Sequence, residues 1–534
     1  MKPNAADSFA TLHLRAIRCA AVWLAMSAVF AGCTALEPLT RLEVFDRTAR
    51  DKAAINSVSI VSGAETSPER PLPFAGAVAY ALANNLDIRL ARLDAVIARG
   101  NLDLTDMGKL PSLLISAGYT FRNPPGSSSD KTPGDAYRTT GSAELSLSAL
   151  DFGVAYLRAK SDANTVLMAE ERRRRTANGI VNEVRQAYWQ ARLGDERLPA
   201  LRATVAQISE AMARSRRVAD SGLQDPLVAL TFQEGLIELQ RQIQIYENDV
   251  VSARARLARL LNLPPSRTLA LSPDKPEDPI DALAAIGRET LEDYALATRT
   301  ELRELDYTIR NRRLDVLSAY AQMLPPLRLR VARMSDSTSS LVDNQWYEEG
   351  FSVAWNVIGI FSALQRAELG RRNLASNELR RLAMSLSVME QVGVARTQIG
   401  ILGQDHRLSR DQSEVRSRIF DIRRVRLPFQ ESDELETVRA AVAVVAAQIR
   451  EDRAYAALQK SYGDLLTALG IDQFPEDFRP DAPEAEQQLA SHLKALPAAI
   501  LTLPEEMARE LSTAALASAT GEAAKAPAPT SPRR

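Results

Sequence analysis

The chain carries one structural unit twice. The segment YALANNLDIR recurs 214 positions later as YALATRTELR, and three shorter anchors recur in the same order. The matched pairs are residues 80–89 and 294–303, 110–111 and 324–325, 146–153 and 352–359, and 261–263 and 469–471. Four anchors in one order, with only small drifts in spacing, predict a duplicated architecture rather than a series of unrelated domains.

Composition narrows the class of protein. Charged residues make up 25% of the 534 positions and the formal net charge is −1. The sequence therefore lacks the excess of basic residues that is typical of nucleic-acid-binding proteins. Aromatic residues are only 5%, and Ala, Leu, Arg and Glu dominate between the anchors. This composition favours long helices.

The N-terminus is typical of an export signal. Lys2, Arg15 and Arg18 precede an apolar run over residues 19–30, which is too short to span a membrane as a helix. Phe30-Ala-Gly then leads to Cys33, a pattern that resembles the bacterial lipobox, with a covalent lipid on that cysteine. An ordinary secretory signal cleaved elsewhere is the alternative. Cleavage before Cys33 leaves it as the only cysteine, which excludes a disulfide within the chain.

We divide the chain as follows: a signal peptide (1–32), a lipid-anchored tether (33–72), a first repeat (73–274), a linker (275–286), a second repeat (287–477) and a C-terminal extension (478–534) that holds one helix near 485–516 and a disordered tail. The repeats begin with helices, the first predicted over 74–109. Each then holds a β-hairpin, at about 112–149 and 326–358, and a helical hairpin, at about 154–262 and 360–470.

The hairpin strands alternate between apolar and polar residues, as a sheet with one face in lipid would. The alternative is part of a soluble sandwich, but four strands are too few for such a core in a chain of this length. Four strands are also too few to close a barrel, since the smallest known have about eight. The chain must therefore associate with copies of itself. The polar positions, predicted to face a lumen, are Ser116, Thr120, Glu144, Ser146, Arg328, Arg330 and Asn356.

The helical hairpins show coiled-coil periodicity. The helix returning to the end of the first repeat carries five unbroken heptads, with Ala229 to Leu257 at one position and Phe232 to Leu260 at the other. An independent coiled-coil dimer is the alternative. The outgoing helices, 154–221 and 360–427, would each be about 100 Å long at 1.5 Å per residue.

With these parts in order, the chain resembles the TolC-like outer-membrane factor family, in its lipidated branch. The resemblance covers about residues 70–480. It rests on Ala77, Ala81-Leu82 and Asn85-Leu86, Leu110-Pro-Ser112, Asp151-Phe-Gly153, Ala187-Tyr-Trp189 and Gly222-Leu223, and in the second repeat on Arg299, Glu301-Leu302, Leu324-Pro325, Ser352, Trp355, Leu466 and Leu469-Gly470.

The resemblance implies a mainly α fold with a small membrane β part. Three chains would form a 12-stranded β-barrel in the outer membrane of a Gram-negative bacterium, continued by a long periplasmic α-helical coiled-coil barrel. The helical tips, near Gly222, Leu223, Leu427 and Pro428, would contact a periplasmic adaptor protein that serves an inner-membrane pump. Glu436, with Arg439 nearby, would lie at the entrance as a gate. The basic run over 405–426 favours a solvated helix face over a role in gating.

Enzyme chemistry is not predicted. The chain has three histidines (His13, His406 and His492), no Cys or His cluster for a metal and no phosphate-binding glycine loop. We therefore expect no catalytic residues, no metal and no cofactor besides the lipid on Cys33.

Three functions stay open at this stage. The first is a passive export duct with energy supplied by a partner. The second is a structural outer-membrane lipoprotein, a coiled-coil stalk without an open pore, and the third is a soluble helical scaffold, which the signal peptide opposes. The polar strand positions favour the duct, because a stalk needs no polar inner face. The exported cargo is not specified by any of these features.

Lipidation can be tested directly. Cys33→Ala should abolish labelling with a clickable palmitate analogue and alter processing, because the sulfur of Cys33 is the predicted site of the lipid. A serine in place of Thr34 leaves the cysteine intact and serves as the control. Unchanged labelling of the Cys33→Ala protein would contradict the lipoprotein interpretation.

Overall fold

A computed structural model describes the chain over residues 46–50, 53, 71–121, 137–221, 226–264, 269–273, 283, 286–338, 341–426, 434–475, 477–480 and 482–519. The chain divides into two compact units, 1–67 and 68–534. In the first unit, residues 46–50 and 53 are helical. The signal peptide, Cys33 and most of the tether lie outside the described residues.

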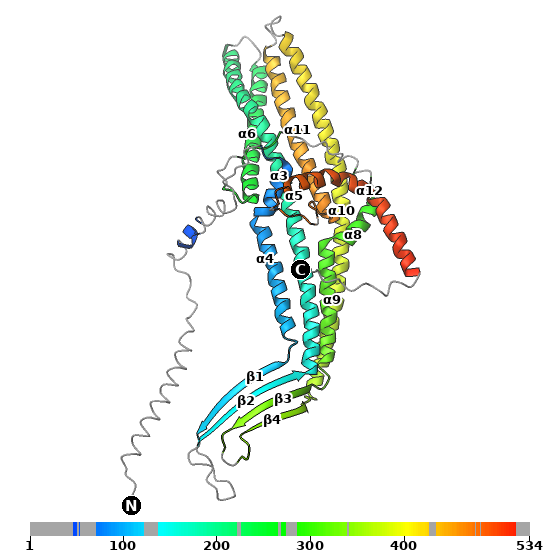
Figure 1. Cartoon of the computed structure of the whole chain (residues 1–534). Coiled ribbons are helices and arrows are strands. Elements are labelled where there is room, and N and C mark those ends of the chain that lie inside the picture. Colours follow the sequence, from blue (N-terminus) through cyan, green and yellow to red (C-terminus); the bar gives the residue numbers. More distant parts are fainter. Residues whose placement is uncertain are drawn as a thin grey trace, which may run out of the picture. The chain divides into compact units, whose positions relative to one another are not determined.

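The second unit contains the two repeats, and their elements correspond one to one (Figure 1). The first repeat consists of α3 (Phe74–Asn84), α4 (Leu86–Met107), β1 (Ser112–Phe121), β2 (Tyr137–Ser148), α5 (Ala149–Ser221) and α6 (Pro226–Leu260). The second consists of α8 (Arg288–Thr298), α9 (Thr300–Ala321), β3 (Leu327–Asp336), β4 (Gln345–Val353), α10 (Gly359–Arg426) and α11 (Glu434–Leu469). This correspondence confirms the duplication.

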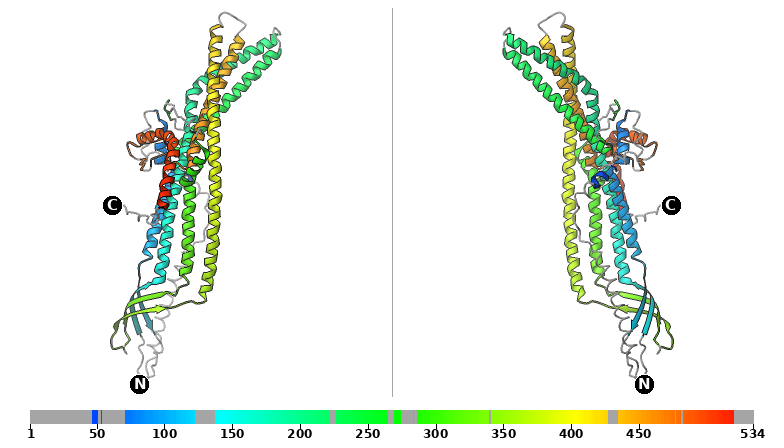
Figure 2. Two further views of the ribbon diagram at one scale, coloured as in Figure 1. Left: turned by 90° about the vertical axis from the view of Figure 1, so that its right-hand side faces the viewer. Right: turned by 90° about the vertical axis from the view of Figure 1, so that its left-hand side faces the viewer.

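The strands lie together at one end of the long helices, and the α5–α6 and α10–α11 hairpins extend from the other end (Figures 1 and 2). Helices α5 and α10 contain 73 and 68 residues, so each is about 100 Å long or slightly more at 1.5 Å per residue. None of the described helices combines the length and the apolar character needed to cross a membrane.

The predicted single helix over 74–109 is wrong in one respect, because it is broken at Asn85. The Asn85 side chain accepts hydrogen bonds from the backbone N–H groups of Asp87 (2.9 Å) and Ile88 (3.4 Å), which caps α4. Its amide nitrogen also donates to the carbonyl of Leu260, 3.0 Å away at the end of α6. An asparagine in an otherwise periodic segment therefore ends one helix and starts the next.

The return helices end in the same way in both repeats. Asn262 and Gly470 adopt positive φ angles of 56° and 70°. After them, the N–H of Leu263 donates to the Ala258 carbonyl (2.8 Å) and that of Ile471 to the Leu466 carbonyl (3.0 Å), as in a Schellman cap. The recurrence of the LNL and LGI anchors thus reflects a shared backbone requirement.

The heptads of α6 form a buried core. All ten predicted positions, from Ala229 to Leu260, are buried, and several of them pack with Leu201 and Ile208 of α5 and with Ile449 of α11. The predicted C-terminal helix is present as α12 (Ala485–Ala519), whose Leu496 and Ile500 join the core of the second repeat. Leu283 and Ile286, in the predicted linker, belong to that same core.

The four strands form one antiparallel sheet in the order β1-β2-β3-β4. Strand β2 pairs with β3, so the sheet joins the two repeats. Strands β1 and β4 are its two edges, and within the described chain neither pairs with a further strand on its outer side. The chain alone therefore makes an open sheet.

Candidate functional site

The sheet has one polar face, as the alternation predicts. The register places Ser116 opposite Ser142, with hydroxyl oxygens 2.7 Å apart, and Ser146 opposite Arg330. Since partners in register share a face, six predicted positions lie on this side: Ser116, Thr120, Glu144, Ser146, Arg328 and Arg330. That this face lines a lumen stays a prediction.

Asn356 was predicted as a lumen-facing strand position, and the structure places it outside the strand. Strand β4 ends at Val353, so Asn356 lies beyond the sheet. Its side-chain oxygen accepts a hydrogen bond from the backbone N–H of Gly359 (3.0 Å), at the first residue of α10. The same N–H also donates to the backbone carbonyl of Asn356 (3.0 Å), so Asn356 belongs to the turn that starts α10 rather than to the strand pattern.

The polar face holds ion pairs that connect strands. Arg330 contacts Glu144 on β2 (3.0 Å) and Glu348 on β4 (3.2 Å), and Arg138 on β2 pairs with Asp336 on β3. Glu348, Arg138 and Asp336 were not among the positions predicted from the sequence. The period-two alternation, continued along the strands, would have placed them on this face.

The opposite face is apolar near the helices. Leu113, Leu145, Leu329 and Phe351 share it, and Phe351 is 77% exposed. Farther from the helices the face also carries Arg333 and Glu349, and both side chains are exposed. Arg333 donates a hydrogen bond to the side chain of Gln345 (2.8 Å). An exposed apolar band of this kind marks an interaction surface, and the described part of the chain leaves it uncovered.

A charge cluster lies just inside the second hairpin turn. Glu436 on α11 accepts hydrogen bonds from Arg439, one turn along, and from Arg423 on α10 (2.8 Å). These two hydrogen bonds, first from Arg423 and then from Arg439, hold the pKa of Glu436 below its ordinary value. The Arg439 guanidinium also lies 5.6 Å from the ring of Phe232 on α6. The predicted pairing of Arg439 with Glu436 is therefore present, and Arg423 is an additional partner drawn from the basic run.

The predicted tip residues Gly222, Leu223, Leu427 and Pro428 lie outside the described residues. Their contact with a partner stays a prediction. No group of three or more His, Cys, Asp or Glu side chains is placed to hold a metal within the ranges that the structure describes.

A second, buried charge cluster connects the two helical hairpins. Asp452 on α11 is 3% exposed. Its carboxylate accepts two hydrogen bonds from Arg197 on α5 (2.9 and 3.1 Å) and one from the hydroxyl of Tyr246 on α6 (3.0 Å). Burial, and then the charge and hydrogen bond of Asp452, raise the pKa of Tyr246, which keeps its hydroxyl protonated as the donor.

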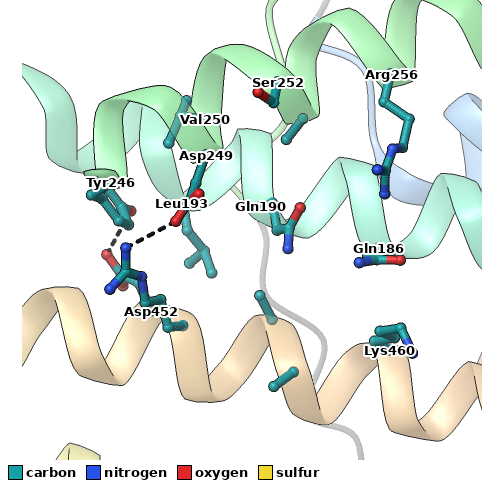
Figure 3. Close-up of a pocket in the computed structure, with 14 residues that line it drawn as sticks. Gln186, Gln190, Leu193, Tyr246, Asp249, Val250, Ser252, Arg256, Asp452 and Lys460 are labelled. Atoms are coloured by element: carbon teal, nitrogen blue, oxygen red, sulfur yellow. Dashed lines mark hydrogen bonds and ion pairs between the residues drawn. The ribbon is translucent and has the colours of Figure 1, made fainter. Parts of the chain in front are cut away.

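This cluster borders a cavity of about 450 Å³ between α5, α6 and α11 (Figure 3). The side chains of Tyr246 and Asp452 lie at one end of it, beside the ion pair between Arg453 and Asp249 (2.9 Å). The sequence predicted Tyr246 as a heptad residue but gave no signal for Asp452, because an acidic residue on a charged helix is ordinarily solvated. Its burial depends on the approach of two hairpins from different repeats.

Comparison with known proteins shows a similarity to one family over part of the chain and a fold shared with solved structures. Residues 77–263 match the family described as outer membrane efflux protein. The protein named "Probable outer membrane lipoprotein SilC" of Salmonella typhimurium is 27% identical over 263 residues, which are 49% of this chain and 55% of that protein. The chain thus aligns with about half the length of this curated relative.

Solved channels share the fold. The CmeC outer membrane channel of Campylobacter jejuni matches with a TM-score of 0.61 at 14% identity, over 79% of this chain and 89% of that one. The open state of the MtrE outer membrane channel of Neisseria gonorrhoeae matches with a TM-score of 0.59 at 16% identity, over 75% and 89%. The combination of a small antiparallel sheet with long helical hairpins is therefore common to these channels and this chain.

The buried cluster predicts that removing an acidic residue of α11 lowers the free energy of unfolding much more than removing an exposed one of α6. Asp452→Ala should lower the free energy of unfolding by about 3–5 kcal/mol, because it leaves Arg197 largely buried without its carboxylate. Asp249→Ala, which removes the exposed pair with Arg453, should cost about 1 kcal/mol or less. Chemical denaturation of the purified variants measures both. Equal losses would mean that the buried cluster does not hold the hairpins together.

Proposed function

We propose that this chain, a member of the outer membrane efflux protein family through residues 77–263, is the outer-membrane channel component of an export system. It would form a passive duct for efflux or secretion, with energy supplied by a partner. The proposal has no catalytic step, and the family is one of channels.

The observation that carries the proposal is the open two-faced sheet. In lipid, each unsatisfied backbone group at a sheet edge costs several kcal/mol, so a membrane sheet must close. Three copies would give 12 strands by pairing β1 of one chain with β4 of the next. The apolar face would then meet lipid, and the polar face would line the lumen.

The helices support the same assembly. Helix α10 carries an exposed apolar stripe at spacings of seven and eight residues: Leu379, Leu386, Val394, Ile401, Leu408, Val415 and Ile422. Helix α4 carries a second one: Leu86, Leu90, Leu93, Ile97 and Leu104. Stripes of this periodicity pack against other helices. Neighbouring copies of the chain would cover them and extend the barrel as a tube of helices.

The partners of the duct follow from the length of the helices. Hairpins of about 100 Å extend across much of a periplasm, so their tips would meet a periplasmic adaptor protein that couples the duct to an inner-membrane pump. A lipid on Cys33 would add an anchor in the outer membrane. The alternative, a structural lipoprotein without an open pore, assigns no role to the polar sheet face.

Two adjacent residues of β1 provide the test. Ile115 lies on the apolar face and Ser116 on the polar face, both at exposed positions. Ile115→Arg should prevent trimer formation, because arginine facing lipid costs about 2–4 kcal/mol near the midplane. Ser116→Arg introduces the same side chain on the other face, and it should assemble. Native mass spectrometry and planar-bilayer conductance measure the outcome. Equal behaviour of the two variants, or a stable non-conducting monomer in the parent, would contradict the duct.

We also infer that the Glu436 cluster acts as the entrance gate. Because its folded-state pKa is depressed, the cluster stabilises the closed tip above the ordinary carboxylate pKa and loses this effect as pH falls through the lowered value. Open probability in bilayers should therefore rise in acid. Glu436→Gln should be open more often at neutral pH and should not respond to acid.

Arg424→Gln is the matched control for the gate. It removes an exposed charge beside Arg423 that pairs with Asp421 instead (3.6 Å). This variant should keep the closed state and its response to acid. If Glu436→Gln conducts like the parent at every pH, the cluster stabilises the tip without gating it.

A further inference from the structure

Six charged side chains lie on the polar face of the sheet, and five of them are paired. The paired residues are Arg138 with Asp336, and Arg330 with Glu144 and Glu348. The sixth is Arg328, which is exposed and forms no ion pair with any residue in the described ranges. It is the second residue of β3, so it lies at the end of the sheet that joins the helices (Figure 1).

The cross-strand neighbours of Arg328 on this face carry no charge. Its register partners are Ser148 on β2 and Ser352 on β4. The nearest acidic residue along the chain from Ser148 is Asp151, in the first turn of α5, and it forms no ion pair with Arg328. No carboxylate in the described ranges therefore pairs with Arg328, and the surplus carboxylate of this face belongs to the Arg330 cluster, farther along the sheet from the helices.

Assembly of copies does not supply a carboxylate from the adjoining strand. The strand that would pair with β4 is β1 of a neighbour, whose polar face consists of Ser112, Leu114, Ser116, Gly118 and Thr120. Between this strand and Arg328 lies only β4, where Ser352 and Gly350 occupy the nearest polar-face positions. Whatever the exact register of the closing pair, β1 introduces no acidic group.

We propose that Arg328 from each copy forms a ring of positive charge without an ion-pair partner at the helix-proximal mouth of the barrel, and that this ring favours passage of anionic solutes. The inference rests on the proposed function and specifies the class of solute. Positive charge between low-dielectric walls concentrates counter-ions and raises their rate of entry. Cargo carrying a carboxylate, sulfonate or phosphate group would be attracted at this level of the duct.

The test measures ion preference in planar bilayers. Reversal potentials in a KCl gradient give the permeability ratio of chloride to potassium for the intact trimer. Arg328→Gln should lower this ratio by about threefold, as expected for removing three unit charges that lie about one Debye length from the axis. Lower salt should enlarge the difference, because screening weakens.

Two controls isolate the ring. Arg328→Lys keeps the charge and should retain the ratio of the parent. Arg333→Gln removes an arginine from the opposite face of the same strand, where it interacts with Gln345 and lies 5.9 Å from the ring of Tyr347. It should leave the ratio unchanged, because its charge lies outside the lumen.

The outcomes separate this inference from the proposed function. A trimer that conducts, but whose ratio is the same in Arg328→Gln and in the parent, overturns the ring and leaves the duct intact. An equal fall in Arg333→Gln also overturns it, because the effect would then not depend on the face. A parent protein that forms no trimer and carries no current overturns the duct itself.

Discussion

Backbone hydrogen bonding at the sheet edges is the constraint on which the rest of the structure depends. A four-stranded meander leaves β1 and β4 each with a row of unpaired N–H and C=O groups. Water can satisfy these groups, whereas lipid cannot. An apolar band on one face and open edges on both sides are therefore compatible only if other strands complete the sheet. The trimer, the lumen and the alignment of three sets of helices that we propose would meet this requirement.

The helical hairpins are subject to a different constraint. They must keep the two repeats aligned along helices of about 100 Å. The apolar heptads of α6 pack against α5 and α11, but apolar packing alone does not fix the axial register of neighbouring hairpins. The buried carboxylate of Asp452 has fixed partners on α5 and α6, so only one register satisfies it. A buried charge adds little net stability compared with apolar packing. Its contribution is to specify the alignment of α11 against the first repeat.

The sequence predicted what depends on local periodicity and missed what depends on distant contacts. The heptads of α6, the strand faces and the two long hairpins were evident because their patterns repeat every seven or two residues. Asn85 and Asn356 were missed because a single capping side chain overrides the pattern around it. Asp452 was missed because its partners lie over 200 residues away. The apolar stripe of α4 is visible in the sequence as helical spacing, but only the structure shows that the described chain leaves it exposed.

Duplication explains why different residues of the two repeats supply a hydrogen-bond donor at the same place in the fold. At the junction of the two short helices, Asn85 donates to the Leu260 carbonyl, and its counterpart Arg299 donates to the Thr467 carbonyl (2.8 Å). Each thereby supplies a donor to the carbonyls left free at the end of a return helix. The backbone requirement is conserved between the repeats and the side chain is not. A charged residue that makes no such backbone hydrogen bond, such as Arg328 on β3, can differ between the repeats without disturbing the fold. The corresponding position on β1 carries no charge. In the proposed duct, Arg328 would therefore alter which solutes pass without altering how the duct is built.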